Sequence, residues 1–218
     1  MSPNINYWHK PDKKCSICPR LTLFRRDNDL RYADWHNAPV ESFGSLDARL
    51  LVIGLAPGLK GANRTGRPFT GDYAGELLYP TMIKFGFANG NYAAAADDSL
   101  KLNDARITNA VRCVPPNNKP IAQEISSCAK FLKLEINKMQ KLFIFLCLGH
   151  ISHKATLRAL GLKISQYKFN HGAIHHLEDG RILVNSYHCS RLNTNTGRLS
   201  TKMFESIFID IQNLLKKN

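Results

Sequence analysis

The chain has 218 residues, of which 44% are hydrophobic and 22% are charged, a balance typical of a globular protein with one sizeable core. Thirty lysines and arginines against 17 aspartates and glutamates give a net charge of +13, which favours a polyanionic partner such as nucleic acid or an acidic membrane face. No apolar run is long enough to span a membrane, and the N-terminal "MSPNINYWHKPDKK" has no apolar signal core, so we expect a cytoplasmic protein.

Taken in chain order, the sequence begins with a polar and aromatic segment, residues 1–45, which has no clear period and predicts an irregular cap. Short apolar runs bounded by turn residues then predict four buried parallel strands, at 48–54, 105–111, 142–149 and 181–188. Helical spacing predicts helices at 74–87, 121–140, 152–161 and 201–217.

The segment 87–104 reads as a loop that carries the chain across to the next strand. Strands that alternate with helices are typical of the α/β class. The sequence therefore predicts one domain over 1–218, a three-layer α/β/α sandwich with a central, mostly parallel, four-stranded sheet.

Polar motifs follow three of these strands. They are "GLAPGLKGANRTGRPFTGDYAG" at 54–75, "NAVRCVPPNNKP" at 109–120 and "YHCSRLNTNTGR" at 187–198. Ligands of open α/β sheets bind at the carboxyl ends of the strands, so we expect the three loops to line one cleft.

The first loop is glycine-rich and carries three cations but a single carboxylate, Asp72. It could be a flexible surface connection, but its composition is better suited to an active-site loop that follows a phosphate backbone. Asp72 itself has two possible roles, as the N-cap of the helix that starts near Tyr73 or as a functional carboxylate, and both can hold together.

Four cysteines stand in polar, proline-rich or helical settings: Cys15 and Cys18 form a Cys-x2-Cys pair, and Cys113 and Cys128 follow later. In a reducing compartment, such thiols are more typical of metal ligands than of disulfides. Four thiolates hold zinc or an iron–sulfur cluster, and the spacing does not choose between them. Cys147, inside "FIFLCLG", reads as a core residue.

Together the three motifs resemble the uracil-DNA glycosylase superfamily, and the branch they resemble most is family 5, the b-type enzymes with an iron–sulfur cluster. The resemblance extends from Cys15 to about Lys202. It implies an α/β/α sandwich and a monomeric enzyme that excises uracil, and other deaminated bases such as hypoxanthine, from DNA by hydrolysing the N-glycosidic bond. This reaction initiates base excision repair. No lysine is evidently placed to form a Schiff base, so we expect a monofunctional enzyme.

The resemblance also implies a [4Fe–4S] cluster on Cys15, Cys18, Cys113 and Cys128, with zinc as the less favoured alternative. Two departures from the family 5 pattern accompany it. The last motif usually reads His-Pro-Ser and here has Cys189 in the middle, which we interpret as a small, serine-like residue and not as a nucleophile. Asn109 matches the base-reading asparagine of family 4, whereas family 5 often has a small residue there. By contrast, "GLAPG" lacks the acidic residue of the family 4 motif "GEAPG", so the first loop agrees with family 5.

The resemblance implies catalytic roles for three residues. Asp72 would position water and stabilise the cationic sugar, and His188 would donate a hydrogen bond to the departing base. Asn118 matches a second polar pocket residue of family 5, although "PPNNKP" is also an ordinary turn sequence.

Four residues are expected to bind the base. Phe69 would stack under it, unless it is simply a core residue, and the amide of Asn109 could pair with N3–H and O4 of uracil. This favours uracil over hypoxanthine, although a turn is the alternative role for Asn109. Gly54 and Ala56 would let the loop backbone approach the base.

The remaining candidates would contact DNA. Leu192 is the candidate wedge for the space left by a flipped base, with packing onto the sheet as its alternative role. The expected phosphate contacts are Arg64, Arg67, Ser190, Arg191 and Arg198.

Two other classes of protein fit parts of the pattern. A nucleic-acid-binding module with a structural metal explains the charge and the cysteines, but not the convergence of Asp72, Asn109 and His188. A hydrolase of phosphorylated small molecules is disfavoured because the glycine-rich loop lacks the G-x4-G-K-[ST] spacing.

Overall fold

The computed structural model describes residues 10–217, so residues 1–9 of the expected cap lie outside the described part of the chain. Its centre is a mixed sheet of six strands in the order β1-β5-β2-β6-β8-β7, with a separate two-stranded sheet, β3-β4. The elements are α1 (Pro19–Arg31), β1 (Phe43–Gly44), β2 (Leu50–Gly54), α2 (Ala62–Thr65), α3 (Tyr73–Lys84), β3 (Ala88–Asn89), β4 (Lys101–Leu102), β5 (Ala105–Asn109), the 3₁₀ helix η2 (Pro116–Asn118), α4 (Ala122–Lys138), β6 (Ile144–Leu148), α5 (His150–Ala159), the 3₁₀ helix η3 (Ile164–Gln166), β7 (Ile174–His176), β8 (Ile182–Ser186), α6 (Arg191–Asn195) and α7 (Thr201–Lys216).

The four strands predicted from the sequence, now β2, β5, β6 and β8, form the parallel centre of the sheet. Every residue in them is buried, which explains why each appears as a continuous apolar run. The sheet has six strands and not four, because β1 and β7 add an antiparallel strand at each edge. These edge strands have only two and three residues, so they leave no recognisable pattern in the sequence.

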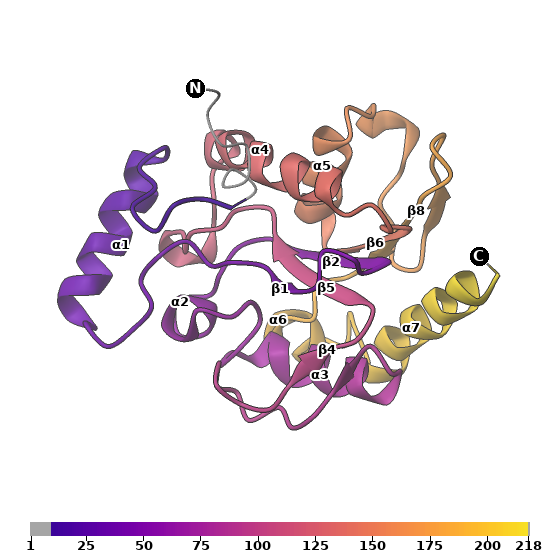
Figure 1. Ribbon diagram of the computed structural model, residues 1–218, viewed down its shortest axis with the longest axis horizontal. Coiled ribbons are helices and arrows are strands. Elements are labelled where there is room, and N and C mark those ends of the chain that lie inside the picture. The colour runs from indigo at the N-terminus through magenta and orange to yellow at the C-terminus, as the bar shows by residue number, and fades with distance from the viewer. Residues whose placement is uncertain (1–9, 218) are drawn as a thin grey trace.

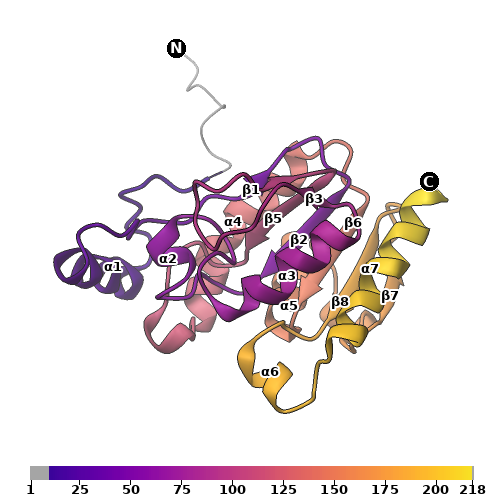
Figure 2. The same cartoon turned by 90° about the horizontal axis from the view of Figure 1, so that it is seen from below.

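Helices cover both faces of the sheet, so the predicted three-layer sandwich is confirmed. Along β2, Leu50 and Val52 pack with α3 and α7, whereas Leu51 and Ile53 pack with α4 and α5. Alternate residues of a strand point to opposite faces, so one strand contributes to both cores. Figure 1 shows α4 and α5 on one side of the sheet and α3 and α7 on the other. Figure 2 shows α3 and α7 across the near face.

Two expectations were wrong in part. The cap contains a 13-residue helix, α1, whose buried stripe is Leu21, Arg25 and Asn28. Those positions have helical spacing, but two of the three are polar, which hides the amphipathic period. The segment 87–104 contains the β3-β4 hairpin, whose strands have two residues each. Among the described residues, no helix combines the length and the apolar character needed to cross a membrane.

Candidate active site

A pocket of about 640 Å³ opens at the carboxyl ends of the parallel strands. The strands β2 and β5 end at its base, and the segment after β8 forms one of its walls. The structure thus brings loops from three separate parts of the chain together, as open α/β sheets do. The expected site residues that line this pocket are Ala56, Phe69, Asp72, Asn109, Asn118, His188, Ser190 and Arg191.

Asn109 is the last residue of β5 and is 3% exposed. Its amide oxygen Oδ1 has no hydrogen-bond partner within the described residues. Gly54 is the residue paired with it on the neighbouring strand β2. A Cβ added to Gly54 would lie 2.4 Å from Oδ1 of Asn109 and 2.5 Å from Cζ of Phe69. Gly54 therefore makes room for the two side chains that we expect to contact the base.

Phe69 has a backbone φ of +54°, which is unusual for a bulky residue. Its ring centroid lies 5.9 Å from that of His188, and the two ring planes differ by 27°. Both rings line the pocket. Strained backbone of this kind is concentrated at functional sites, so its presence here supports more than a packing role for Phe69.

His188 is partly buried beside this ring, and burial lowers its pKa to about 4. The imidazole is therefore neutral near pH 7 and carries one N–H that can donate. Its backbone oxygen accepts a hydrogen bond from Nδ2 of Asn193 at 2.8 Å, which ties the strand end to α6.

Asp72 is the N-cap of α3, and its Oδ1 accepts a hydrogen bond from the backbone N–H of Gly75 at 3.3 Å. The capping role considered for it is therefore confirmed, and its side chain also lines the pocket. The other oxygen, Oδ2, lies against the glycine-rich loop: a Cβ on Gly61 would be 2.4 Å from it and one on Gly58 3.0 Å. Burial raises the pKa of Asp72 above its usual value.

Asn118 connects the second loop to the first. Its Oδ1 accepts a hydrogen bond from the backbone N–H of Leu59 at 3.3 Å. Asn117 and Asn118 both have positive φ, at 54° and 55°, a conformation that asparagine tolerates well. Asn118 thus lines the pocket and also holds the two loops together.

The last motif forms the short helix α6, which begins after Ser190 because the serine hydroxyl accepts a hydrogen bond from the N–H of Asn193. Leu192 is 72% exposed on this helix, so it is not the packing anchor considered as an alternative. The guanidinium of Arg191 lies 5.3 Å from the ring centroid of Tyr73, whose hydroxyl accepts a hydrogen bond from Thr194 at 2.9 Å.

Tyr73 also lines the pocket, and we did not identify it as a site residue from the sequence. Its position directly after Asp72, at the first residue of α3, is the signal that could have found it. Lys60 lines the same pocket from the first loop.

The other expected phosphate contacts lie outside this pocket. Arg64 is exposed, and its Nε donates to the backbone oxygen of Lys60 at 2.9 Å. Arg198 stacks over Tyr187 at 4.5 Å. Arg67 does not have the expected exposed position: it is 6% exposed and pairs with Asp98, since both of its terminal nitrogens donate to that carboxylate.

The four cysteines with the expected ligand pattern, Cys15, Cys18, Cys113 and Cys128, line one small pocket between α1 and α4. All are free thiols, and burial raises the pKa of Cys113 to about 12. The backbone N–H of Arg112 donates to Sγ of Cys128 at 3.4 Å.

This donor set fits an iron–sulfur cluster, because four thiols from three segments surround one space and a backbone N–H already points at one sulfur. No group of three or more His, Cys, Asp or Glu side chains in residues 10–217 is arranged to hold one metal ion. Cys147 is buried in the core as expected. Cys189 is also fully buried, and burial raises the pKa of its thiol, which does not favour a nucleophile.

Comparison with known proteins agrees with this geometry. The family model "Uracil DNA glycosylase superfamily" matches residues 41–212. The chain belongs to this superfamily. A type-5 uracil-DNA glycosylase of Thermus thermophilus is 41% identical over 92% of this chain and 93% of its own length. A second type-5 enzyme, of Pyrobaculum aerophilum, is 36% identical over 88% of this chain and 85% of its own length.

A type-4 uracil-DNA glycosylase of Pyrobaculum aerophilum is also similar, at 30% identity over 70% of this chain and 64% of its own length. The glycosylase chain is thus similar to enzymes of both types, with higher identity and longer coverage for the two type-5 relatives. This agrees with the resemblance to family 5 seen in its motifs.

Proposed function

We propose that this glycosylase excises uracil from DNA, and that Asn109 reads the base. The unpartnered Oδ1 of Asn109 carries the proposal. A buried acceptor without a donor costs about 1–3 kcal/mol, and the N3–H of uracil would supply the missing donor. The amide NH2 would donate to O4. Cytosine presents an acceptor at N3 and a donor at C4, so it would not match the same orientation of the amide.

The neighbouring groups suit cleavage of the bond between C1′ and N1. As this bond breaks, its electron pair moves onto the base, and the neutral imidazole of His188 would donate its N–H to the carbonyl oxygen that gains charge. The carboxylate of Asp72 would stabilise the positive charge on the sugar and orient a water molecule. The oxygen of that water would bond to C1′ and its proton would pass to the Asp72 carboxylate, while the uracil anion would gain a proton at N1, so the products would be an abasic site and free uracil.

The flipped nucleotide would reach the pocket from the DNA stack. Phe69 would stack on the pyrimidine, and Leu192, exposed on α6, would enter the space that the base leaves. Extrusion costs a few kcal/mol and is least costly at a mismatch such as U·G, so we expect faster excision there than at U·A. We also expect uracil to be preferred over hypoxanthine.

We further propose that Cys15, Cys18, Cys113 and Cys128 hold a [4Fe–4S] cluster. Such a cluster would cross-link the segment before α1 to the loop after β5 and to α4. No step of the hydrolysis needs it, since Asp72 and His188 lie in the other pocket. A brown protein that absorbs visible light would support the cluster; a colourless protein containing zinc would contradict it.

The test is single-turnover excision on labelled duplexes with U·G, U·A, hypoxanthine·T or no lesion, followed by alkali to cut abasic sites. We expect cleavage at uracil and a loss of about 10²–10⁴-fold in Asp72→Asn. Asparagine caps helices as well as aspartate does, so this variant keeps the start of α3. DNA binding without excision by the folded wild-type protein would contradict the proposal and favour a binding module.

The expectation that no lysine is placed for Schiff-base chemistry needs its own test, because Lys60 lines the pocket. We propose hydrolysis by water, which predicts no covalent complex with uracil-containing DNA after borohydride reduction. A trapped complex that disappears in Lys60→Ala would show lyase chemistry. The monomeric state and the cytoplasmic location stay predictions of the sequence.

A further inference from the structure

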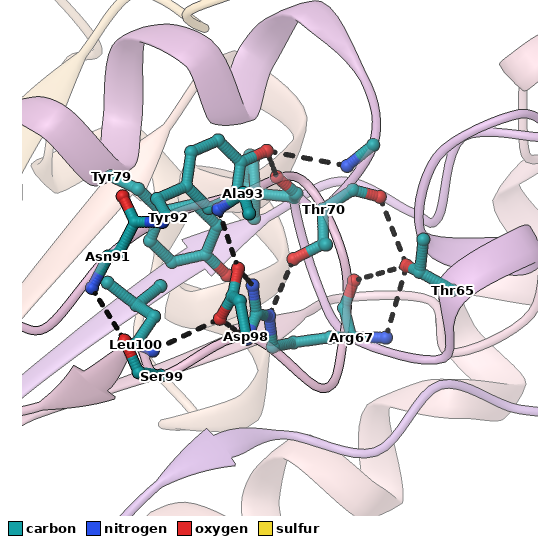
Figure 3. A network of polar contacts seen from close by, with 12 residues as sticks. Thr65, Arg67, Thr70, Tyr79, Asn91, Tyr92, Ala93, Asp98, Ser99 and Leu100 are labelled. Atoms are coloured by element: carbon teal, nitrogen blue, oxygen red, sulfur yellow. Dashed lines mark hydrogen bonds and ion pairs between the residues drawn. The ribbon is translucent and has the colours of Figure 1, made fainter.

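A buried ion pair involves one residue of the glycine-rich loop, and neither partner lines the pocket. It joins Arg67, within the loop, to Asp98, in the segment between β3 and β4. The side chains are 6% and 3% exposed, and the two N···O distances are 2.7 and 2.8 Å. Figure 3 shows the pair at the centre of a network of polar contacts. The Arg67 guanidinium holds the pKa of Asp98 at about 2, so the pair stays charged at any usual assay pH.

Asp98 organises its own segment as well. Its Oδ2 accepts a hydrogen bond from the backbone N–H of Ala93 at 2.9 Å, and its Oδ1 accepts one from Leu100 at 3.1 Å. The bond from Ala93 closes the turn that directly follows Tyr92. Three rings surround the Arg67 guanidinium at 5.1–6.0 Å, those of Phe43, Tyr79 and Tyr92. One carboxylate therefore holds both the arginine and the segment that covers it.

From this pair, hydrogen bonds run to the backbone on each side of Phe69. Nε of Arg67 donates to Oγ1 of Thr70 at 2.8 Å, and that hydroxyl donates to the carbonyl of Pro68 at 3.1 Å. The hydroxyl of Tyr79 donates to the same carbonyl at 2.5 Å. The hydroxyl of Tyr92 lies 3.4 Å from the carbonyl of Phe69.

These contacts hold a residue whose backbone conformation is unfavourable in isolation. A φ of +54° is unfavourable for a phenylalanine and persists only where the surroundings impose it. We propose that Asp98 is a positioning residue for base excision, which acts through Arg67 to hold the ring of Phe69 where the flipped base stacks. This proposal rests on the proposed function, and it assigns a role to a segment that the sequence presented only as a crossover loop.

Asp98→Asn would leave a buried guanidinium without its counter-charge, so Arg67 would have to move towards water. The carbonyls around Phe69 would then lose their fixed donors, and the ring would shift. A misplacement of about 1 Å costs on the order of 10²-fold in rate, so we expect Asp98→Asn to lower single-turnover excision by about 10–100-fold.

A double-mutant cycle with Phe69→Ala separates positioning from general stability. We expect the loss caused by Asp98→Asn in the wild-type background to be mostly absent in the Phe69→Ala background. Asp104→Asn is the matched control, because Asp104 pairs with Arg49 at 2.7 Å at the amino end of β5, away from the pocket. We expect this control to excise uracil at the wild-type rate.

Equal losses from Asp98→Asn in both backgrounds would overturn the proposal, as would no loss in either. If Asp98→Asn does not fold, Asp98→Asn combined with Arg67→Met removes both charges, and the same cycle applies to it. If the wild-type protein itself does not excise uracil, the proposed function fails instead. The NMR signals of the Phe69 ring in Asp98→Asn then decide this inference, and unchanged signals would overturn it.

Discussion

Replacing Gly61 by alanine tests how tightly the glycine-rich loop holds the Asp72 carboxylate. A Cβ at Gly61 would lie 2.4 Å from Oδ2 of Asp72 and 2.8 Å from its Cγ, whereas ordinary contact begins at 3.4 Å. The carboxylate must therefore move by about 1 Å, or the loop must open by the same distance. At a reacting centre such a shift costs on the order of 10²-fold in rate, or about 2.7 kcal/mol of transition-state stabilisation.

The assay is single-turnover excision from a U·G duplex, with DNA affinity measured separately by fluorescence anisotropy. Affinity should stay at the wild-type value because the substitution removes no cation. Gly58→Ala is the matched control: its Cβ would lie 3.0 Å from the same oxygen, about 0.4 Å inside ordinary contact, so its loss of rate should be much smaller.

Two results would refute this reasoning. The first is a wild-type excision rate in Gly61→Ala. The second is a full additional loss when Gly61→Ala is placed in an Asp72→Asn background, since the glycine would then act through something other than the carboxylate.

Three further predictions follow from other features of the structure. Leu192→Ala should slow excision at U·A more than at U·G, and equal effects on the two duplexes would contradict the role of Leu192 as a wedge. Leu30 is also highly exposed, so Leu30→Ala serves as the control and should leave both excision rates unchanged. The pKa of His188, measured by NMR, should lie near 4, and a value of 6.5 would contradict this. Between about pH 6.5 and about pH 4 only the unfolded chain binds the proton, so this group should make the fold less stable as the pH falls through that range. Glu135, on α4, pairs with the guanidinium of Arg112 at 2.5 Å, and both side chains are buried. Glu135→Gln should therefore lower the free energy of unfolding by about 3–5 kcal/mol in denaturant titrations, because it leaves this guanidinium underpaired; a loss below about 1 kcal/mol would contradict it.

Much of the fold is encoded in local patterns. The four parallel strands are buried on both faces, so each is a short apolar run, and the helices α3, α4, α5 and α7 lie close to the ranges expected from helical spacing. The same apolar runs showed that the polar motifs stand at the ends of strands. Because parallel strands end at one edge of the sheet, those positions were enough to predict that Asp72, Asn109 and His188 share a pocket.

Elements whose stability comes from contacts far along the chain were not predictable in this way. The strands β1 and β7 are too short to show a period, and they exist because each pairs with an edge of the parallel sheet. The stripe of α1 is partly polar because Arg25 binds backbone carbonyls of residues 13 and 15, so no apolar period marks it.

The role of Arg67 could not be predicted from the local sequence. In the sequence it is one of three cations on a basic loop, and phosphate binding was the natural expectation. In the tertiary structure its partner is Asp98, 31 residues further on. The sequence by itself determined which residues carry charge and where the strands end. Only the tertiary structure decided which charges face the solvent and which are paired inside, because that depends on long-range contacts that bring a counter-charge to a buried group.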